Sequence, residues 1–540
     1  MSDSKKQSLV IGALIGSAGI FFTKFIGMIY VIPFNALVGE ENMAFYSYAY
    51  RTYSYILNIC TAGFPYAIAT LVAKYMVKED YRAVLFVRKI SFYAMFILGS
   101  LSMIGLITVA TPLATVVSPI EATPEYIEKV RNCYIIISTA LFFVPLLSVF
   151  RGFYQGMKEL TVYASNQVIE QIARVTFLLV AGFIAVYIFK QDRIVAIYFA
   201  VLSAAVSAVV AIAQFLLKDR KVISKLKENI NEESGVSTKS ILRELVRYAI
   251  PYMVVAILGY SYFIVDMLVF NRVMGWRGEV NADLIYGIIN MNVDKLTSIP
   301  MAVAPGFSIA IVPYVTACYV KGDKEGASRN VTDCIVMALY LALPLTLALL
   351  SLATPIYYVM YGGTYAALGG EILAWYSLDG FASTIAPVLT SLTMALNLRR
   401  KNMKNVAIGI LMKVITVVPL IYAFGYVGAL LSSVLGSLAG AFLNFKAISE
   451  YIEISYHKIL KITSKIFLCL LATQIVFSLG QIIGFKIVDQ SRFIALIELA
   501  IVGLSGAFTY FALSFYLGIP QKILHKSTSE IIGMFRRKLA

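Results

Sequence analysis

Long apolar segments recur along the whole chain, and they restrict the possible folds more than any other feature. Each can cross the ~30 Å hydrocarbon core of a bilayer as an α-helix. Apolar residues make up 59% of the chain and charged residues only 14%, so membrane helices use most of the apolar residues and a large soluble catalytic domain is excluded. Four segments contain no charged residue: Phe92–Ala110, Ile194–Leu217, Leu296–Val320 and Ile466–Phe485.

Ten further segments are similarly long and apolar. Several contain an ionisable residue, which a cavity or a partner can solvate inside the membrane. We therefore predict an all-α polytopic membrane protein with 14 transmembrane helices. The ten segments are Leu9–Phe34, Phe45–Val72, Cys133–Phe150, Val168–Phe189, Tyr248–Phe270, Val331–Met360, Glu371–Leu396, Val406–Phe424, Tyr426–Phe445 and Phe493–Leu517.

The Lys and Arg residues are distributed unevenly between the two sides of this predicted bundle. If the N-terminus is cytoplasmic, 33 of the 46 Lys and Arg residues lie in cytoplasmic segments, eight lie in outer segments and five lie within helices. Loops rich in Lys and Arg remain in the cytoplasm, so this bias predicts that both termini are cytoplasmic. It also accounts for the net charge of +16 without nucleic acid as a partner.

A weak internal repeat divides the chain. The segment 67–81 resembles 308–324, and the turn 155–158 resembles 397–400, about 242 residues later. Six helices separate the copies, which predicts two pseudo-symmetric six-helix lobes with the same orientation in the membrane. The predicted domains are an N-terminal lobe (1–217), a basic cytoplasmic linker (218–247), a C-terminal lobe (248–447), two additional transmembrane helices (448–517) and a cytoplasmic amphipathic tail (518–540).

Five cations lie within the predicted helices, where each costs at least about 2.5–3.5 kcal/mol. They are Lys24, Arg51, Arg174, Lys295 and Lys413. Glu170 lies four residues before Arg174, so we expect these two to form a structural ion pair on one helix face. The other cations need a different explanation.

Lys24, Arg51 and Lys295 have no carboxylate three or four residues away. If they meet in one cavity, charge-assisted hydrogen bonds to a phosphate or diphosphate offset the cost of burying them. The alternative is that Lys24 and Arg51 extend to the membrane interface. The chain has only two histidines and no GK[ST] phosphate-binding loop, so we expect transport without catalytic residues, cofactor or metal site.

Three segments of the chain resemble a family of membrane transporters. The segments are Thr23–Phe34 (TKFIGMIYVIPF), Asn58–Tyr66 (NICTAGFPY) and, most specifically, Val144–Arg174. They are similar to the SpoVB/YtgP branch of the MurJ-type lipid II flippases, in the multidrug/oligosaccharidyl-lipid/polysaccharide (MOP) exporter superfamily. The resemblance extends from about Leu9 to Phe445.

The resemblance implies a function as well as a fold. It implies a flippase that moves lipid II, the undecaprenyl-diphosphate-linked peptidoglycan precursor, from the inner to the outer leaflet by alternating access, for cell-wall synthesis. Lys24 and Lys295 occupy positions where the family carries arginines in helices one and eight, whereas Arg51 does not align well with the arginine of helix two. The resemblance therefore implies substrate binding by Lys24 and Lys295, and the cavity inferred from the buried cations adds Arg51 to the predicted substrate-binding residues.

Some members of this family use a sodium site between helices seven, eleven and twelve. Here the resemblance points to Asp266 on helix seven and Lys413 on helix eleven. Either the Lys413 ammonium takes the place of the ion in coupling, or the two side chains form an ordinary salt bridge between helices. Transport would be driven by Na⁺ or by the membrane potential, which favours outward movement of an anion by about 2.3 kcal/mol per charge per 100 mV.

The same cavity would suit other substrates, and the residues alone do not separate them. One alternative is another polyprenyl-linked polysaccharide unit, such as a teichoic acid or capsule unit. A MATE-like drug antiporter would need an acidic cavity, and a polyprenyl-dependent membrane glycosyltransferase would need a catalytic acid beside a large outer loop. The expected partners are therefore a polyprenyl-diphosphate-linked glycan and membrane lipids, and we expect a monomer in the cell membrane.

Overall fold

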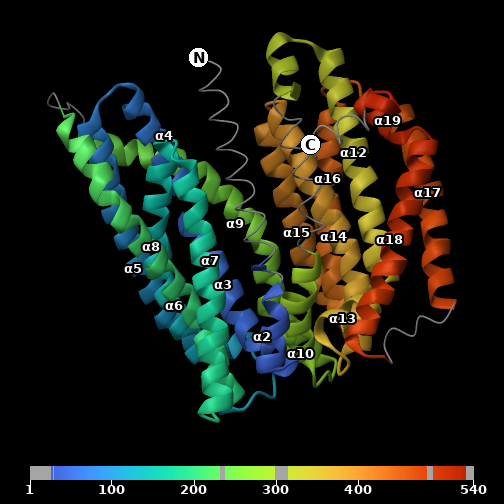
Figure 1. Ribbon diagram of the computed structural model, residues 1–540, viewed down its shortest axis with the longest axis horizontal. Helices are drawn as coiled ribbons and strands as arrows, with labels where there is room; N and C mark the ends of the chain where they lie inside the picture. The colour runs from blue at the N-terminus through green and yellow to red at the C-terminus, as the bar shows by residue number, and fades with distance from the viewer. Residues whose placement is uncertain are drawn as a thin grey trace. The chain divides into compact units, whose positions relative to one another are not determined.

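The computed structural model describes residues 26–27, 29–61, 63–230, 238–297, 314–482 and 490–530. Within these residues the secondary structure is helical and contains no strand, as Figure 1 shows. The helices form two compact units, Met1–Gly287 and Ile288–Ala540.

The first unit is built around α6, which packs against α3, α4, α5 and α8. Aromatic side chains fill the core between these helices: the ring of Phe215 stacks on Phe150 with centroids 5.7 Å apart. The helices of this unit are α2 (Val31–Val38), η1 (Glu40–Asn42), α3 (Met43–Thr61), α4 (Phe64–Val77), α5 (Tyr81–Val117), α6 (Pro124–Gly156), α7 (Leu160–Phe183), η2 (Ile184–Ile188), α8 (Arg193–Glu228), α9 (Thr238–Trp276) and α10 (Ala282–Gly287).

In the second unit α14 and α16 pack together, with α12 against α14 and α15 against α16. The pair α17 and α18 joins this group through α12 and α13; in Figure 1 the pair is red, and α12 and α13 are yellow. The helices are η3 (Ile288–Val293), α12 (Lys324–Ser351), α13 (Ala353–Tyr361), α14 (Ala366–Ala395), α15 (Arg399–Phe424), α16 (Tyr426–Ser449), α17 (Tyr456–Ile482), α18 (Arg492–Tyr516) and α19 (Ile519–Leu524).

Twelve helices within the described ranges are long and apolar enough to cross a membrane, by length and composition. They match twelve of the fourteen predicted segments, which confirms the all-α membrane fold. The two other predicted helices, Leu9–Phe34 and Leu296–Val320, extend over residues outside the described ranges. The count of fourteen therefore stays a prediction.

One turn recurs in both units with the same local geometry. Between α4 and α5, Glu79 has a left-handed φ of 56°, and the Asp80 side chain accepts a 2.8 Å hydrogen bond from a backbone N–H in the first turn of α5. Before α12, Gly322 has a φ of 73°, and the Asp323 side chain caps that helix with a hydrogen bond of the same length. An aspartate cap accepts a hydrogen bond from a backbone N–H group that has no partner within the helix. Both turns have such a cap, and this similarity supports the predicted repeat.

A second pair of turns also shares a left-handed residue. Lys158 follows α6 with a φ of 65°, and Asn397 follows α14 with a φ of 59°. Each is the left-handed residue that ends its helix. The predicted pairing of the turn 155–158 with 397–400 stays a prediction.

The predicted linker 218–247 is largely helical and packs into the first unit. α8 continues to Glu228, and α9 begins at Thr238. Within this extension the buried Asp219 accepts a 2.9 Å hydrogen bond from the Tyr154 hydroxyl and pairs with Arg88. The compact units divide only after Gly287, because α9 packs against α3, α4 and α5.

The contact between α4 and α6 is close at Gly152. A Cβ at this position would lie 2.8 Å from the Pro65 carbonyl oxygen and 2.9 Å from Ile68 Cβ. We expect Gly152→Ala to lower the free energy of unfolding by about 1–3 kcal/mol, because the helices must separate to admit the methyl group. Thermal unfolding of the purified protein measures this change.

Gly105 on α5 provides the matched control, since no atom lies within 4 Å of a Cβ built there. Gly105→Ala should leave the unfolding midpoint unchanged or raise it, because alanine favours helix more than glycine. Equal midpoints for the two variants would contradict the close contact at Gly152.

Candidate functional site

A cavity of 360 Å³ opens within the first unit, between α3, α6, α7 and α9. We call it the arginine pocket, because three arginines from three helices line it. Four tyrosines also line it, and tyrosine hydroxyls can donate to and accept from a polar ligand. The lining residues are Tyr50, Arg51, Tyr53, Ser54, Tyr55, Leu57, Asn58, Val144, Arg151, Glu170, Arg174, Tyr260 and Phe263.

Glu170 is the centre of an ion-pair network in this pocket. Its Oε1 lies 2.8 Å from Arg174 Nη2, one turn further along α7, and its Oε2 lies 2.5 Å from Arg151 Nη2 of α6. The carboxylate is 12% exposed, and each arginine side chain is 17% exposed. A carboxylate that is mostly removed from water needs such partners, because the cost of burying it is otherwise large.

Asn166 of α7 holds Arg151 in place from the other side. Its side-chain oxygen accepts hydrogen bonds from Arg151 Nε and Nη2 at 3.3 and 3.2 Å. Its amide nitrogen donates to the Ala211 carbonyl at 2.9 Å and to Gln214 Oε1 at 2.8 Å, both on α8. The donors and the acceptor of Asn166 are therefore all engaged. The guanidinium of Arg151 is held by two residues of α7, Asn166 and Glu170, and Asn166 is itself anchored to α8.

Arg51 enters the pocket from α3, along a row of aromatic rings. Its guanidinium lies over the Phe263 ring of α9, 4.2 Å from the ring centroid. On the same helix the rings of Tyr50 and Tyr46 stack with centroids 5.6 Å apart. A cation over an aromatic face is stabilised by about 0.5–1 kcal/mol at exposed sites and by more when it is desolvated.

The side chains that line the arginine pocket carry three positive charges and one negative charge. Guanidinium groups bind phosphate and carboxylate oxygens through paired N–H donors, and these charge-assisted bonds are stronger than neutral ones. The pocket is therefore suited to an anionic group with several oxygens and unsuited to a cation.

Sequence analysis did not identify Arg151 as a site residue. The predicted membrane segment Cys133–Phe150 ends one residue before Arg151, whereas α6 continues to Gly156 and holds Arg151 in its last turns. The sequence feature that could have placed Arg151 on the helix is the uninterrupted helical segment that precedes Gly156. Tyr260 and Phe263 were also missed, because their side of α9 faces the pocket only when that helix packs on α3.

The structure tests only part of the predicted cation cluster. Arg51 lines the arginine pocket, and Lys24 lies outside the described residues. Lys295 follows η3 in the second unit and is half-buried; its neighbour Asp294 accepts a 3.0 Å hydrogen bond from the Tyr376 hydroxyl of α14. The convergence of Lys24, Arg51 and Lys295 on one cavity stays a prediction.

The predicted pair Asp266 and Lys413 belongs to two different units. Asp266 is half-buried on α9 of the first unit, and Lys413 is fully buried on α15 of the second. Lys413 Nζ donates a short hydrogen bond to Ser433 Oγ on α16. The contact of Lys413 with Asp266 stays a prediction.

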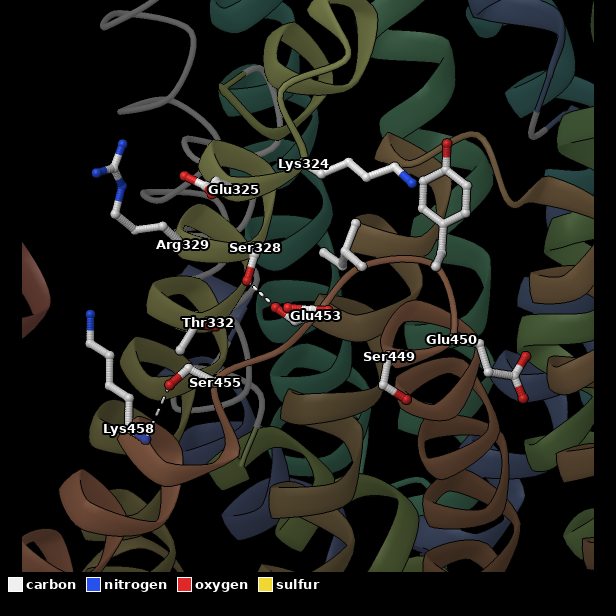
Figure 2. Close-up of a pocket in the computed structure, with 12 residues that line it drawn as sticks. Lys324, Glu325, Ser328, Arg329, Thr332, Ser449, Glu450, Glu453, Ser455 and Lys458 are labelled. Carbon is white, nitrogen blue, oxygen red and sulfur yellow. Dashed lines mark hydrogen bonds between the residues drawn. The ribbon is translucent and has the colours of Figure 1, made fainter.

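The second unit contains a larger pocket of 520 Å³, shown in Figure 2, between the first turns of α12 and the loop that joins α16 and α17. Three basic and three acidic residues line it, so their charges balance. Lys458 is also paired with Asp333 at 2.7 Å, and Glu450 with Lys401 at 3.1 Å. A pocket with balanced charges attracts a phosphate less than the arginine pocket does, although its volume is larger.

Across the described parts of the chain, no group of three or more His, Cys, Asp and Glu side chains could hold a metal ion.

Comparisons with known proteins agree with this architecture. A family model described as "Polysaccharide biosynthesis protein" matches residues 9–318. "Lipid II flippase MurJ" of Bacillus subtilis (strain 168) is 28% identical, over 98% of this chain and 99% of the relative. "Stage V sporulation protein B" of the same organism is 25% identical, over 83% and 85%.

A solved structure supports the same fold. The structure of "Lipid II flippase MurJ, inward closed conformation" matches with a TM-score of 0.68 at 14% identity, over 95% of this chain and 100% of that chain. The matches to curated relatives and to this structure confirm the resemblance identified from the sequence.

Proposed function

The chain belongs to the family of polysaccharide biosynthesis proteins, and we propose that it is a transporter that flips lipid II across the membrane. Similarity to the B. subtilis lipid II flippase over nearly the whole length of both proteins supports this function. A flippase moves its substrate without changing its covalent bonds, so the protein is not an enzyme.

The observation that carries the proposal is the charge of the arginine pocket. Lipid II carries a diphosphate between its sugars and its polyprenyl chain, and Arg51, Arg151 and Arg174 provide guanidinium groups for such an anion. A drug antiporter for cations would need the opposite charge, and the pocket contains only one carboxylate. A glycosyltransferase would need a catalytic acid or base free to act, whereas Glu170 is held by two arginines.

In the proposed cycle the diphosphate leaves the inner leaflet and enters a cation-lined cavity by alternating access, while the polyprenyl chain remains in the lipid. In this proposal Lys24, Arg51 and Lys295 are the cations that bind the diphosphate. The membrane potential assists the outward step, because moving a negative charge out of a negative cell interior gains about 2.3 kcal/mol per 100 mV. In this proposal Lys413 takes the place of a coupling ion beside Asp266.

We further propose a location and an orientation. The twelve apolar helices are those of a multi-pass membrane protein, and the proposed substrate places it in the cell membrane. Both termini are cytoplasmic in this proposal, because 33 of the 46 Lys and Arg residues then lie on the cytoplasmic side. The protein acts as a monomer, since a single chain supplies the cationic cavity.

Depletion of the protein from its own cells tests the function. Lipid II should accumulate with its headgroup on the cytoplasmic side, because its exit is blocked while its synthesis continues. The measurement is mass spectrometry of polyprenyl-linked lipids, combined with a headgroup label that cannot cross the membrane. Accumulation of a different polyprenyl-linked glycan, with lipid II unchanged, would reassign the substrate, and no accumulation of any such lipid would exclude a flippase function.

A further inference from the structure

A second basic site lies in the second unit, where α17 begins and α19 ends. A pocket of 480 Å³ opens there, and we call it the α17–α19 pocket. Among the described residues none of those that line it is acidic. Its polar side chains are His457, Lys458, Lys461, Gln521, Lys522 and His525.

One carboxylate behind the pocket fixes its shape. Asp333 of α12 lies 2.7 Å from Lys458 Nζ and 2.8 Å from His525 Nε2. These contacts hold the residue after α19 against α12 and α17. Lys458 is therefore already paired, and the unsatisfied charge of the pocket comes from its other lysines.

Lys461 and Lys522 are the two exposed lysines of the α17–α19 pocket. Neither forms an ion pair with another described residue. Lys465 lies one turn further along α17, within electrostatic reach of both. Three like charges so close together repel one another, and an anion between Lys461 and Lys522 relieves this repulsion.

The pocket lies at the ends of two helices that are long and apolar enough to cross a membrane. The apolar helix Tyr456–Gly480 begins at it, and the apolar helix Arg492–Tyr516 ends just before α19. Along α17 large apolar side chains are exposed both next to the pocket, at Leu460 (70%), and further along the helix, at Leu471 (62%). The pocket therefore combines cations at the interface with an apolar helix face that continues into the membrane.

We propose that the α17–α19 pocket binds the phosphate of an anionic phospholipid, with the acyl chains lying along the exposed face of α17. Lys461 and Lys522 donate charge-assisted hydrogen bonds to the phosphate oxygens. Basic pockets between membrane helices bind lipid headgroups in this way. The site is distinct from the arginine pocket and does not depend on the transported substrate.

Native mass spectrometry of the full chain in detergent tests the proposal. The protein is mixed with phosphatidylglycerol or with phosphatidylcholine of the same acyl chains, and the retained lipid is counted. We expect preferential retention of phosphatidylglycerol. The double variant Lys461→Gln/Lys522→Gln should reduce it by about 25-fold, because each lysine near an anionic headgroup contributes about fivefold. The charge-preserving Lys461→Arg/Lys522→Arg should retain it.

The matched control is Lys404→Gln/Lys446→Gln, which removes two exposed lysines of the same unit outside the pocket and should leave retention unchanged. Equal retention of the two lipids by the unmodified protein would overturn the proposal without any variant. Unchanged retention in Lys461→Gln/Lys522→Gln would also overturn it. Displacement of phosphatidylglycerol by millimolar inorganic phosphate would assign the pocket to free phosphate and exclude a lipid site.

Discussion

Arg51→Ala should abolish most lipid II transport while leaving the protein folded. Removal of one partner of a buried charge interaction costs about 2 kcal/mol or more, which corresponds to about a 30-fold loss. The folded protein loses the contact of Arg51 with Phe263, and a cation over an aromatic ring contributes about 0.5–1 kcal/mol at an exposed site. Transport is measured in proteoliposomes, as the rate at which labelled lipid II headgroups become accessible.

The matched control is Arg400→Ala, which removes an exposed arginine from the first turn of α15. It should leave the rate unchanged. Lys24→Ala and Lys295→Ala extend the test to the predicted cation cluster and should each slow transport. If all three variants transport normally at normal expression, the proposal that these cations bind the diphosphate is wrong.

Glu170→Gln should destabilise the first unit more than any other single change considered. The substitution leaves Arg151 and Arg174 next to each other without the carboxylate that pairs with both. Breaking a buried ion pair on one side costs about 3–5 kcal/mol, because an uncompensated charge stays buried. A thiol-reactive dye measures the loss, since Cys60 and Cys133 of the first unit are buried and become reactive when this unit unfolds.

Glu125→Gln is the comparison for this prediction. Glu125 pairs with Lys129 at 2.8 Å, but its side chain is 75% exposed, so its loss should change stability by less than about 1 kcal/mol. Combining Glu170→Gln with Arg151→Gln should restore part of the lost stability, because both members of one pair are then neutral. Equal unfolding midpoints for Glu170→Gln and Glu125→Gln would show that the network contributes little.

The contacts in the two basic sites can be predicted from the sequence to different extents. Glu170 and Arg174 are four residues apart on one helix, so their spacing predicts the contact. Arg151 reaches the same carboxylate only through the packing of α6 on α7. The α17–α19 pocket joins residues about sixty positions apart, which the hairpin of α17 and α18 brings together.

The amino-acid sequence by itself determined the class of protein, the positions of twelve membrane helices and the predicted side of each loop. These properties depend on the length and charge of single segments, and a bilayer acts on each segment separately. The tertiary structure alone decided which side chains share a cavity. The rotation of each helix about its axis, and therefore the direction of Arg51, Arg151 and Lys461, is set by packing between segments that are distant in the chain.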